Sequence, residues 1–176
     1  MALGIEKQLA KIIASKTKMS NGRTVKQNLE KAVDYLYDCI DNQIREYYLS
    51  YDPKIYNRTF DFRDSLYAEN FINARVVGNR IELSVSFRDS MSYHENLFKD
   101  HKSFVPVLIN FGWKAPKLES FIGRKIDRFT EYDGFHMVEK AISQFNAQNS
   151  FGIHISHNDV KAVWNGKPID KQYYKW

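Results

Sequence analysis

Apolar residues recur at helical spacing near the start of the chain. Ile5, Leu9, Ile12 and Ile13 follow one another at short intervals of up to four residues, with lysines and polar residues between them. Because this spacing places side chains on one side of an α-helix, it predicts an amphipathic helix over residues 3–16.

The strongest periodic pattern comes next, in residues 24–50. Apolar side chains repeat there every three or four positions for roughly six or seven turns. Thr24 and Gln27 have the spacing of a capping box, in which each side chain binds a backbone N–H at the start of a helix. We therefore expect a long helix that begins near Val25 and is ended by Pro53, since the residue before a proline avoids the helical conformation.

Residues 71–87 alternate between apolar and polar side chains and predict a β-hairpin. Gly78-Asn79 suits a two-residue turn, because glycine readily adopts positive φ. This turn sets the cross-strand pairs of the hairpin: Ile72 with Val85, Ala74 with Leu83, Val76 with Ile81, Val77 with Arg80 and, on the polar face, Arg75 with Glu82.

Three further elements are expected downstream. Alternation over residues 105–111 predicts a third strand, and Pro106 would place its beginning at a sheet edge because proline cannot donate a ladder hydrogen bond. Helical spacing predicts a second helix over 134–147, with Asp133 as its N-cap. The alternation from 151 to 155 predicts a strand.

Residues 160–164 and 167–169 complete the pattern as a small C-terminal hairpin. The stretches 88–104 and 114–132 are rich in polar and charged residues and predict two long loops.

These elements predict one α+β domain over residues 1–176. A basic helical arm, 1–23, precedes a core of residues 24–148, and a strand and hairpin extension occupies 149–176. In the core, the two helices are expected to pack on an antiparallel sheet built from 71–77, 80–87 and 105–111, from which the two long loops project.

Composition supports an ordered protein with an uneven charge. The chain is 43% hydrophobic and 15% aromatic, which favours a packed core. Residues 1–31 hold seven basic and two acidic residues, and this difference equals the net charge of +5 for the whole chain. A basic arm can contact nucleic acid, an anionic protein partner or a membrane surface, and it is also a common solvated helix face.

Cysteine usage and hydropathy point to an intracellular protein. Cys39 is the one cysteine, so an intramolecular disulfide is excluded, and its apolar helical position predicts a core residue. No stretch has the length and apolar character of a membrane span or a signal peptide. We expect a protein kept in a reducing cytoplasm, without membrane contact.

Catalytic patterns are weak. His154 and His157 would point to opposite faces of a strand, and no further ligand stands near them at metal-site spacing. His94-Glu95 and His136 with Glu139 offer acid–base chemistry only in principle. No phosphate-binding loop, nucleophile elbow or dinucleotide fingerprint is present. We expect no enzyme activity, no cofactor and no metal.

Several short motifs stand in a specific order. The long helix ends in a tyrosine-rich cluster that leads into Tyr56-x-Arg58-Thr59, and an aromatic-Gly-aromatic triplet follows the third predicted strand. This order resembles the head–tail joining, or tail completion, proteins of long-tailed bacteriophages, over roughly residues 24–148. The residues that carry the resemblance are Tyr56, Arg58, Thr59, Ser65, Phe111, Gly112 and Trp113.

The resemblance implies a structural virion protein that forms an oligomeric ring in the neck, joins the DNA-filled head to the tail and surrounds the DNA channel. Its partners would be further copies of itself, other neck, portal-adaptor or tail proteins, and channel DNA by non-specific contact. It would occupy the virion, and the host cytoplasm during assembly.

Basic and aromatic residues of the second loop and the C-terminal tail are the candidate contacts, because Tyr, Trp and Arg dominate binding hot spots. They are Lys114, Lys117, Phe121, Arg124, Lys125, Arg128, Tyr173, Tyr174 and Trp176. The alternative function is a small basic nucleic-acid-binding protein of phage or bacterial origin, in which the same residues would contact phosphates and bases and binding would weaken with salt.

Overall fold

The computed structural model describes residues 2–50, 60–78, 80–88, 93–95, 102–114, 131–160, 163–164 and 167–168. The helices are α1 (Ala2–Lys16), α2 (Val25–Leu49), α3 (Asp61–Asp64), α5 (Val105–Phe111) and α6 (Met137–Gln148), with 3-10 helices η1 (Phe71–Asn73) and η2 (His157–Asp159). The strands are β1 (Leu66–Ala68), β2 (Arg75–Val77), β3 (Arg80–Glu82), β4 (Val85–Phe87), β5 (Tyr93–Glu95), β6 (Lys102–Phe104), β7 (Trp113–Lys114), β8 (Glu131–Tyr132), β9 (Val163–Trp164) and β10 (Lys167–Pro168). The predicted α+β class is confirmed.

The first two helices form where the periodicity predicts them. Thr24 caps α2 through the expected capping box: the Gln27 N–H donates to Thr24 Oγ1 at 3.2 Å, and the Thr24 N–H donates to Gln27 Oε1 at 2.9 Å. The helix ends at Leu49, where the Ser50 N–H donates back to the Glu46 carbonyl at 2.9 Å. Pro53, expected to end this helix, lies outside the described residues.

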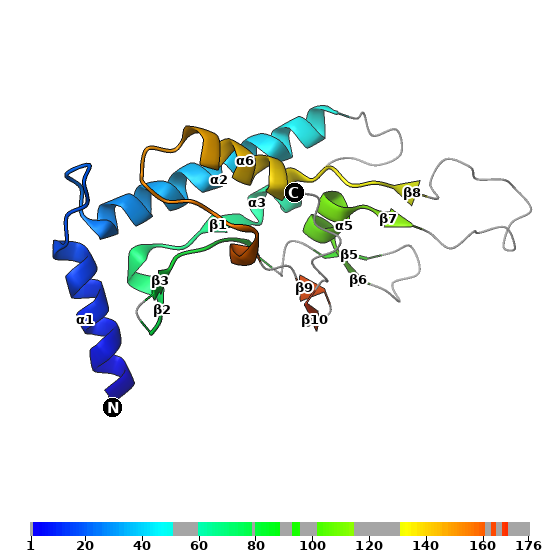
Figure 1. Ribbon diagram of the computed structural model, residues 1–176. Coiled ribbons are helices and arrows are strands. Elements are labelled where there is room, and N and C mark those ends of the chain that lie inside the picture. Colours follow the sequence, from blue (N-terminus) through cyan, green and yellow to red (C-terminus); the bar gives the residue numbers. More distant parts are fainter. Residues whose placement is uncertain are drawn as a thin grey trace, which may run out of the picture.

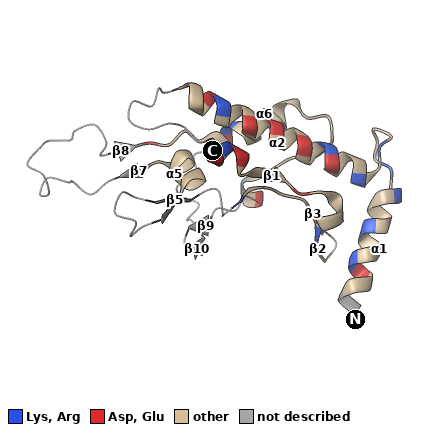
Figure 2. Cartoon of the chain, turned by 180° about the vertical axis from the view of Figure 1, so that it is seen from behind, with Lys and Arg blue, Asp and Glu red and all other residues tan. Residues whose placement is uncertain are grey.

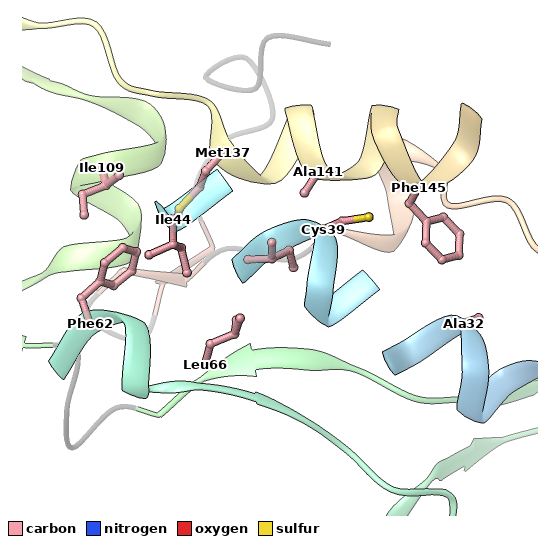
Figure 3. Close-up of a cluster of buried hydrophobic side chains, with 10 residues drawn as sticks. Ala32, Cys39, Ile44, Phe62, Leu66, Ile109, Met137, Ala141 and Phe145 are labelled. Carbon is pink, nitrogen blue, oxygen red and sulfur yellow. The ribbon is translucent and has the colours of Figure 1, made fainter. Parts of the chain in front are cut away.

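The core lies between α2 and α6, which run side by side (Figure 1). Figure 3 shows side chains from α2, α3, β1, α5 and α6 pointing toward one another in this cluster. The buried members are Ala32, Cys39, Ile40, Ile44, Phe62, Leu66, Ile109, Met137, Ala141 and Phe145. Cys39 is fully buried, as predicted, and burial raises the pKa of its thiol.

The hairpin has the predicted register but only half the predicted length. β2 and β3 pair Val77 with Arg80, Val76 with Ile81 and Arg75 with Glu82. Ile72 and Ala74, the predicted partners of Val85 and Leu83, are not in a strand, because residues 71–73 form η1 and Ala74 is its C-cap residue. The Asn70 side chain caps the start of η1 by accepting the Asn73 N–H. β4 pairs instead with β1, and Ile72 is 81% exposed where a core position was predicted.

The prediction of a third strand over 105–111 is wrong. These residues form α5, in which Pro106, Val107, Ile109 and Asn110 are buried, a pattern with helical rather than alternating spacing. Proline in the first turn of a helix loses no intrahelical hydrogen bond, so Pro106 is compatible with this structure. The described strands therefore form five two-stranded antiparallel pairs, β1–β4, β2–β3, β5–β6, β7–β8 and β9–β10, and not the predicted three-stranded sheet.

The second predicted helix is confirmed as α6, but its cap is not Asp133. His136 is the N-cap residue, in a left-handed conformation with φ 53° and ψ 41°, and it makes no side-chain cap hydrogen bond. Asn110 of α5 caps the helix from a distance, because its Oδ1 accepts the Val138 N–H at 2.8 Å.

Residues 151–155 form no strand, contrary to the prediction. The Asn146 side chain takes the place of a neighbouring strand: its Oδ1 accepts the Ile155 N–H at 3.0 Å, and its Nδ2 donates to the Ile155 carbonyl at 2.9 Å. Phe151, Ile153 and Ile155 still pack against the core. The small C-terminal hairpin is confirmed as β9–β10.

Parts of both predicted loops are paired strands. β5 and β6 lie within 88–104, and β7 and β8 lie at the two ends of 114–132. The rest of these stretches lies outside the described residues.

Candidate functional site

The structure fixes the two ends of the segment that holds most candidate contact residues. β7 and β8 pair Trp113 with Tyr132 and Lys114 with Glu131, so the two strands that flank residues 115–130 lie side by side (Figure 1). Lys114 is thus placed in β7. The other candidates lie outside the described residues: Lys117, Phe121, Arg124, Lys125, Arg128, Tyr173, Tyr174 and Trp176.

Four of the seven motif residues are described, and three of these lie together at the end of α5. Phe111 is the last residue of that helix, Gly112 follows with φ 79°, and Trp113 begins β7. The aromatic-Gly pair therefore ends a helix here, and not the strand that the resemblance implied. Ser65 is buried after α3, where its Oγ donates to the Phe62 carbonyl at 2.6 Å. Tyr56, Arg58 and Thr59 lie outside the described residues.

The chain entering α6 runs directly against the end of α5. The Phe135 N–H donates to the Ile109 carbonyl at 2.7 Å, and the His136 N–H donates to the Asn110 carbonyl at 3.1 Å. Gly134 lies so close that a Cβ on it would be 2.4 Å from the Asn110 carbonyl oxygen and 2.7 Å from the Gly112 nitrogen. This backbone contact fixes the position of β7 and β8 on the body of the molecule, that is, on the core formed around α2 and α6.

A buried polar junction, made of Asn110, His136 and Glu139, completes this attachment. Asn110 Nδ2 donates to Glu139 Oε2 at 2.9 Å, while Asn110 Oδ1 caps α6. His136 Nδ1 lies 4.0 Å from Glu139 Oε1, and neither atom has a hydrogen-bond partner among the described residues. Buried polar groups are normally paired, so this junction stands out from the rest of the core.

Sequence reasoning noticed His136 and Glu139 only as a weak acid–base pair and missed Asn110. The available signal was a polar side chain inside an otherwise apolar run, Val107-Leu108-Ile109-Asn110-Phe111. Such a residue is costly to bury unless it is hydrogen-bonded, and Asn110 is bonded on both sides. Asn110 lies shortly before β7 in the chain and His136 shortly after β8. The junction therefore positions the β7–β8 pair, whose strands flank residues 115–130.

The other histidines give no catalytic grouping within the described structure. His154 is exposed, and His94 with Glu95 falls in β5. Within the residues that the structure describes, no three His, Cys, Asp or Glu side chains gather as metal ligands would.

Two surfaces at opposite ends of α2 expose large apolar side chains. One, the apolar row, consists of Ile5, Leu9, Ile12 and Ile13 on α1. The other, the far patch, consists of Leu49 at the end of α2 and Phe60 before α3.

Comparison of the chain with protein-family profiles, characterised proteins and solved structures finds no match. No helix in the described part of the chain is long and apolar enough to cross a membrane.

Proposed function

We propose that this chain is a structural subunit of a tailed bacteriophage virion, which forms a ring in the neck and joins the filled head to the tail. The proposal starts from the resemblance carried by the motif residues. The observation that carries it furthest is the β7–β8 pair, which brings both ends of the basic and aromatic 115–130 segment together on the body.

The attachment of that segment suits a contact between subunits. Gly134, the α5 carbonyls and the buried polar junction fix where the segment leaves the body. A segment held at both ends loses less conformational freedom on binding than a free tail, which favours affinity. Its Arg and Phe side chains are of types that are enriched at protein interfaces, and its Lys and Arg charges favour electrostatic steering.

In this role the protein needs no turnover, no cofactor and no metal. Its partners are other copies of itself and the adjoining neck, portal-adaptor or tail proteins, and basic side chains facing the channel contact DNA without sequence preference. The mature protein belongs to the virion and is made in the host cytoplasm.

The register of β7 and β8 gives a clean variant for the test. Lys114 pairs directly with Glu131, so residues 115–130 can be replaced by Asn-Gly, a two-residue turn that suits an antiparallel hairpin. A phage lacking the gene is complemented with either form, and free heads, free tails and joined particles are counted in micrographs. The shortened protein should fold, as checked by thermal unfolding, and should yield filled heads that fail to join tails.

Normal joining with the shortened protein would refute the role of this segment, and normal joining without any form of the protein would refute the function. The nucleic-acid-binding alternative predicts a different result. The shortened protein would then bind DNA or RNA more weakly, with a shallower dependence on salt, while joined particles would form normally.

A further inference from the structure

Helix α1 buries Ala14 and exposes its large apolar side chains. The four residues of the apolar row are 51% to 68% exposed, whereas Ala14 is 4% exposed. At about 100° per residue, Ala14 lies roughly 180° around the helix from Ile5. The face of α1 that packs on the body is therefore the opposite of the face that carries its isoleucines and leucine.

The orientation of α1 follows from contacts on that small face. Ala14 packs with Phe71 and Ala74, and Lys11 Nζ donates to the Ile72 carbonyl at 2.6 Å. From this attachment the helix runs away from the body, with its N-terminal end farthest out (Figure 1). The apolar row therefore has no partner among the described residues of its own chain.

The far patch lies about 37 Å away along α2, given its 25 residues and a rise of 1.5 Å per residue. Leu49 is 84% exposed, and Phe60 packs edge-on against Tyr48 with ring centroids 5.3 Å apart. One chain thus carries two unlike apolar surfaces at opposite ends of its longest helix.

The charged residues of α1 are mostly basic, whereas α2 carries both acidic and basic residues (Figure 2). α1 carries Lys7, Lys11 and Lys16 against Glu6. Lys16 lies only about 20° around the helix from Ile5, whereas Lys7 and Lys11 lie toward the opposite side, where Lys11 Nζ donates to the Ile72 carbonyl. Close to Leu49 and Phe60 along the chain, Glu46, Asp61 and Asp64 are exposed. Nearby Arg45 and Arg63 both bind Asp41, at 2.9 and 2.6 Å.

We propose that the apolar row of one copy packs on the far patch of the next copy, with Lys16, which lies on the same side of α1 as the row, facing the exposed acidic residues near Leu49 and Phe60. The contact joins two different surfaces, so its repetition around an axis closes a ring. This inference rests on the proposed function, because the contact would join neighbouring subunits of the proposed neck ring. A membrane or nucleic acid would use α1 alone and would leave the far patch without a role.

Cross-linking of the full-length purified protein tests this contact. The single native cysteine is fully buried, so introduced thiols dominate the reaction. The double variant Leu9→Cys/Leu49→Cys, treated with a short bis-maleimide, should give a ladder of linked multimers. Leu9→Cys alone and Leu49→Cys alone should stay unlinked, and an equal mixture of the two should give linked dimers only.

A matched control uses Val77, another exposed apolar residue, which lies on the β2–β3 hairpin outside both surfaces. The variant Leu9→Cys/Val77→Cys should give no ladder. Ile12→Asp should abolish the ladder of the Leu9→Cys/Leu49→Cys variant without lowering its melting temperature, because Ile12 does not pack on the body.

Three results would overturn the contact. They are linked dimers from Leu9→Cys alone, which would show a two-fold α1–α1 contact; the absence of any ladder; and binding of anionic vesicles or duplex DNA that Ile12→Asp abolishes while the protein stays monomeric. The cross-linking assay needs no phage, so its outcome is independent of the joining assay. A ladder together with normal joining in the absence of any form of the protein would keep the contact and refute the neck function. The absence of a ladder together with failed joining in the absence of the protein would refute the contact alone.

Discussion

Gly134 would bring an added Cβ closer to neighbouring atoms than Gly4, Gly22, Gly78 or Gly152 would. Its φ of 85° is one that L side chains rarely adopt, and a Cβ would meet three backbone atoms within 2.7 Å. Backbone atoms cannot swing aside as a flexible side chain can, so a larger residue has to push α5 away from the start of α6.

Gly134→Ala should lower the free energy of unfolding by about 2–4 kcal/mol, since backbone strain and overpacking add. The matched control is Gly22→Ala, which has a similar φ of 78° but no atom within 4 Å of the added Cβ. It should cost only the conformational strain, about 1–2 kcal/mol. Urea unfolding measures both, and equal losses would show that the close contact at Gly134 is unimportant.

Glu139 can be tested within the buried polar junction. Glu139→Gln keeps an acceptor for Asn110 Nδ2 and adds an amide donor on the side that faces His136 Nδ1, so unfolding free energy should stay within about 1 kcal/mol of wild type. Glu139→Leu leaves Asn110 Nδ2 unpaired and should cost about 1–3 kcal/mol. If Gln costs as much as Leu, the charge of Glu139 and not its hydrogen bond to Asn110 holds the junction.

At the scale of elements, α3 is attached to α2 through one buried carboxylate. Asp41 accepts from Arg63 Nε at 2.6 Å and Nη2 at 3.1 Å, and from Arg45 Nη2 at 2.9 Å. Burial raises the pKa of Asp41, but the hydrogen bond from Arg63 and the charges of both arginines outweigh it and lower the pKa below its ordinary value.

Asp41→Asn should therefore destabilise the protein by about 2 kcal/mol at neutral pH, as for a hydrogen bond to a charged group. A lowered pKa in the folded state means that this stability is present above the unfolded pKa of about 3.9 and is lost as pH falls through the folded value. The difference between wild type and variant, measured by urea unfolding from pH 7 to pH 2, should stay constant down to about pH 4 and shrink below it. A difference that disappears by pH 6 would contradict this origin.

Elements whose signals are local could be predicted from the sequence. The α2 capping box needs only Thr24 and Gln27, and the β2–β3 register needs only the turn at Gly78 and the pairing that follows from it. Helical spacing likewise identified α1 and α6, and the apolar position of Cys39 placed it in the core.

Elements decided by distant side chains could not be predicted. Asn110 of α5 caps α6, and the Asn146 side chain binds the Ile155 backbone where a neighbouring strand was expected. β4 pairs with β1 and not with the other strand of the predicted hairpin. Residues 105–111 satisfied both an alternating and a helical pattern, and burial of the polar Asn110 beside Ile109 selects the helix. The same distinction holds at the candidate site. The basic and aromatic residues of 115–130 were identified from the sequence, but the contacts of Gly134 and of the buried polar junction with α5 were not.

At the scale of the whole molecule, the body separates the surfaces that we assign to assembly. α1 projects at one end of α2, and the β7–β8 pair lies toward the other end (Figure 1). A subunit with contact surfaces on different sides can bind a neighbour in the ring through one and a different protein above or below through another. Ring formation and joining therefore have separate structural requirements in this account.

The most direct test of the neck function is a reconstruction of the neck of purified virions by electron cryo-microscopy. The proposed neck function predicts a ring of repeated copies between head and tail, recognisable by the long α2 helix packed beside α6, with α1 of each copy against the next copy. Absence of this chain from the neck density, together with its absence from purified particles by mass spectrometry, would contradict the account.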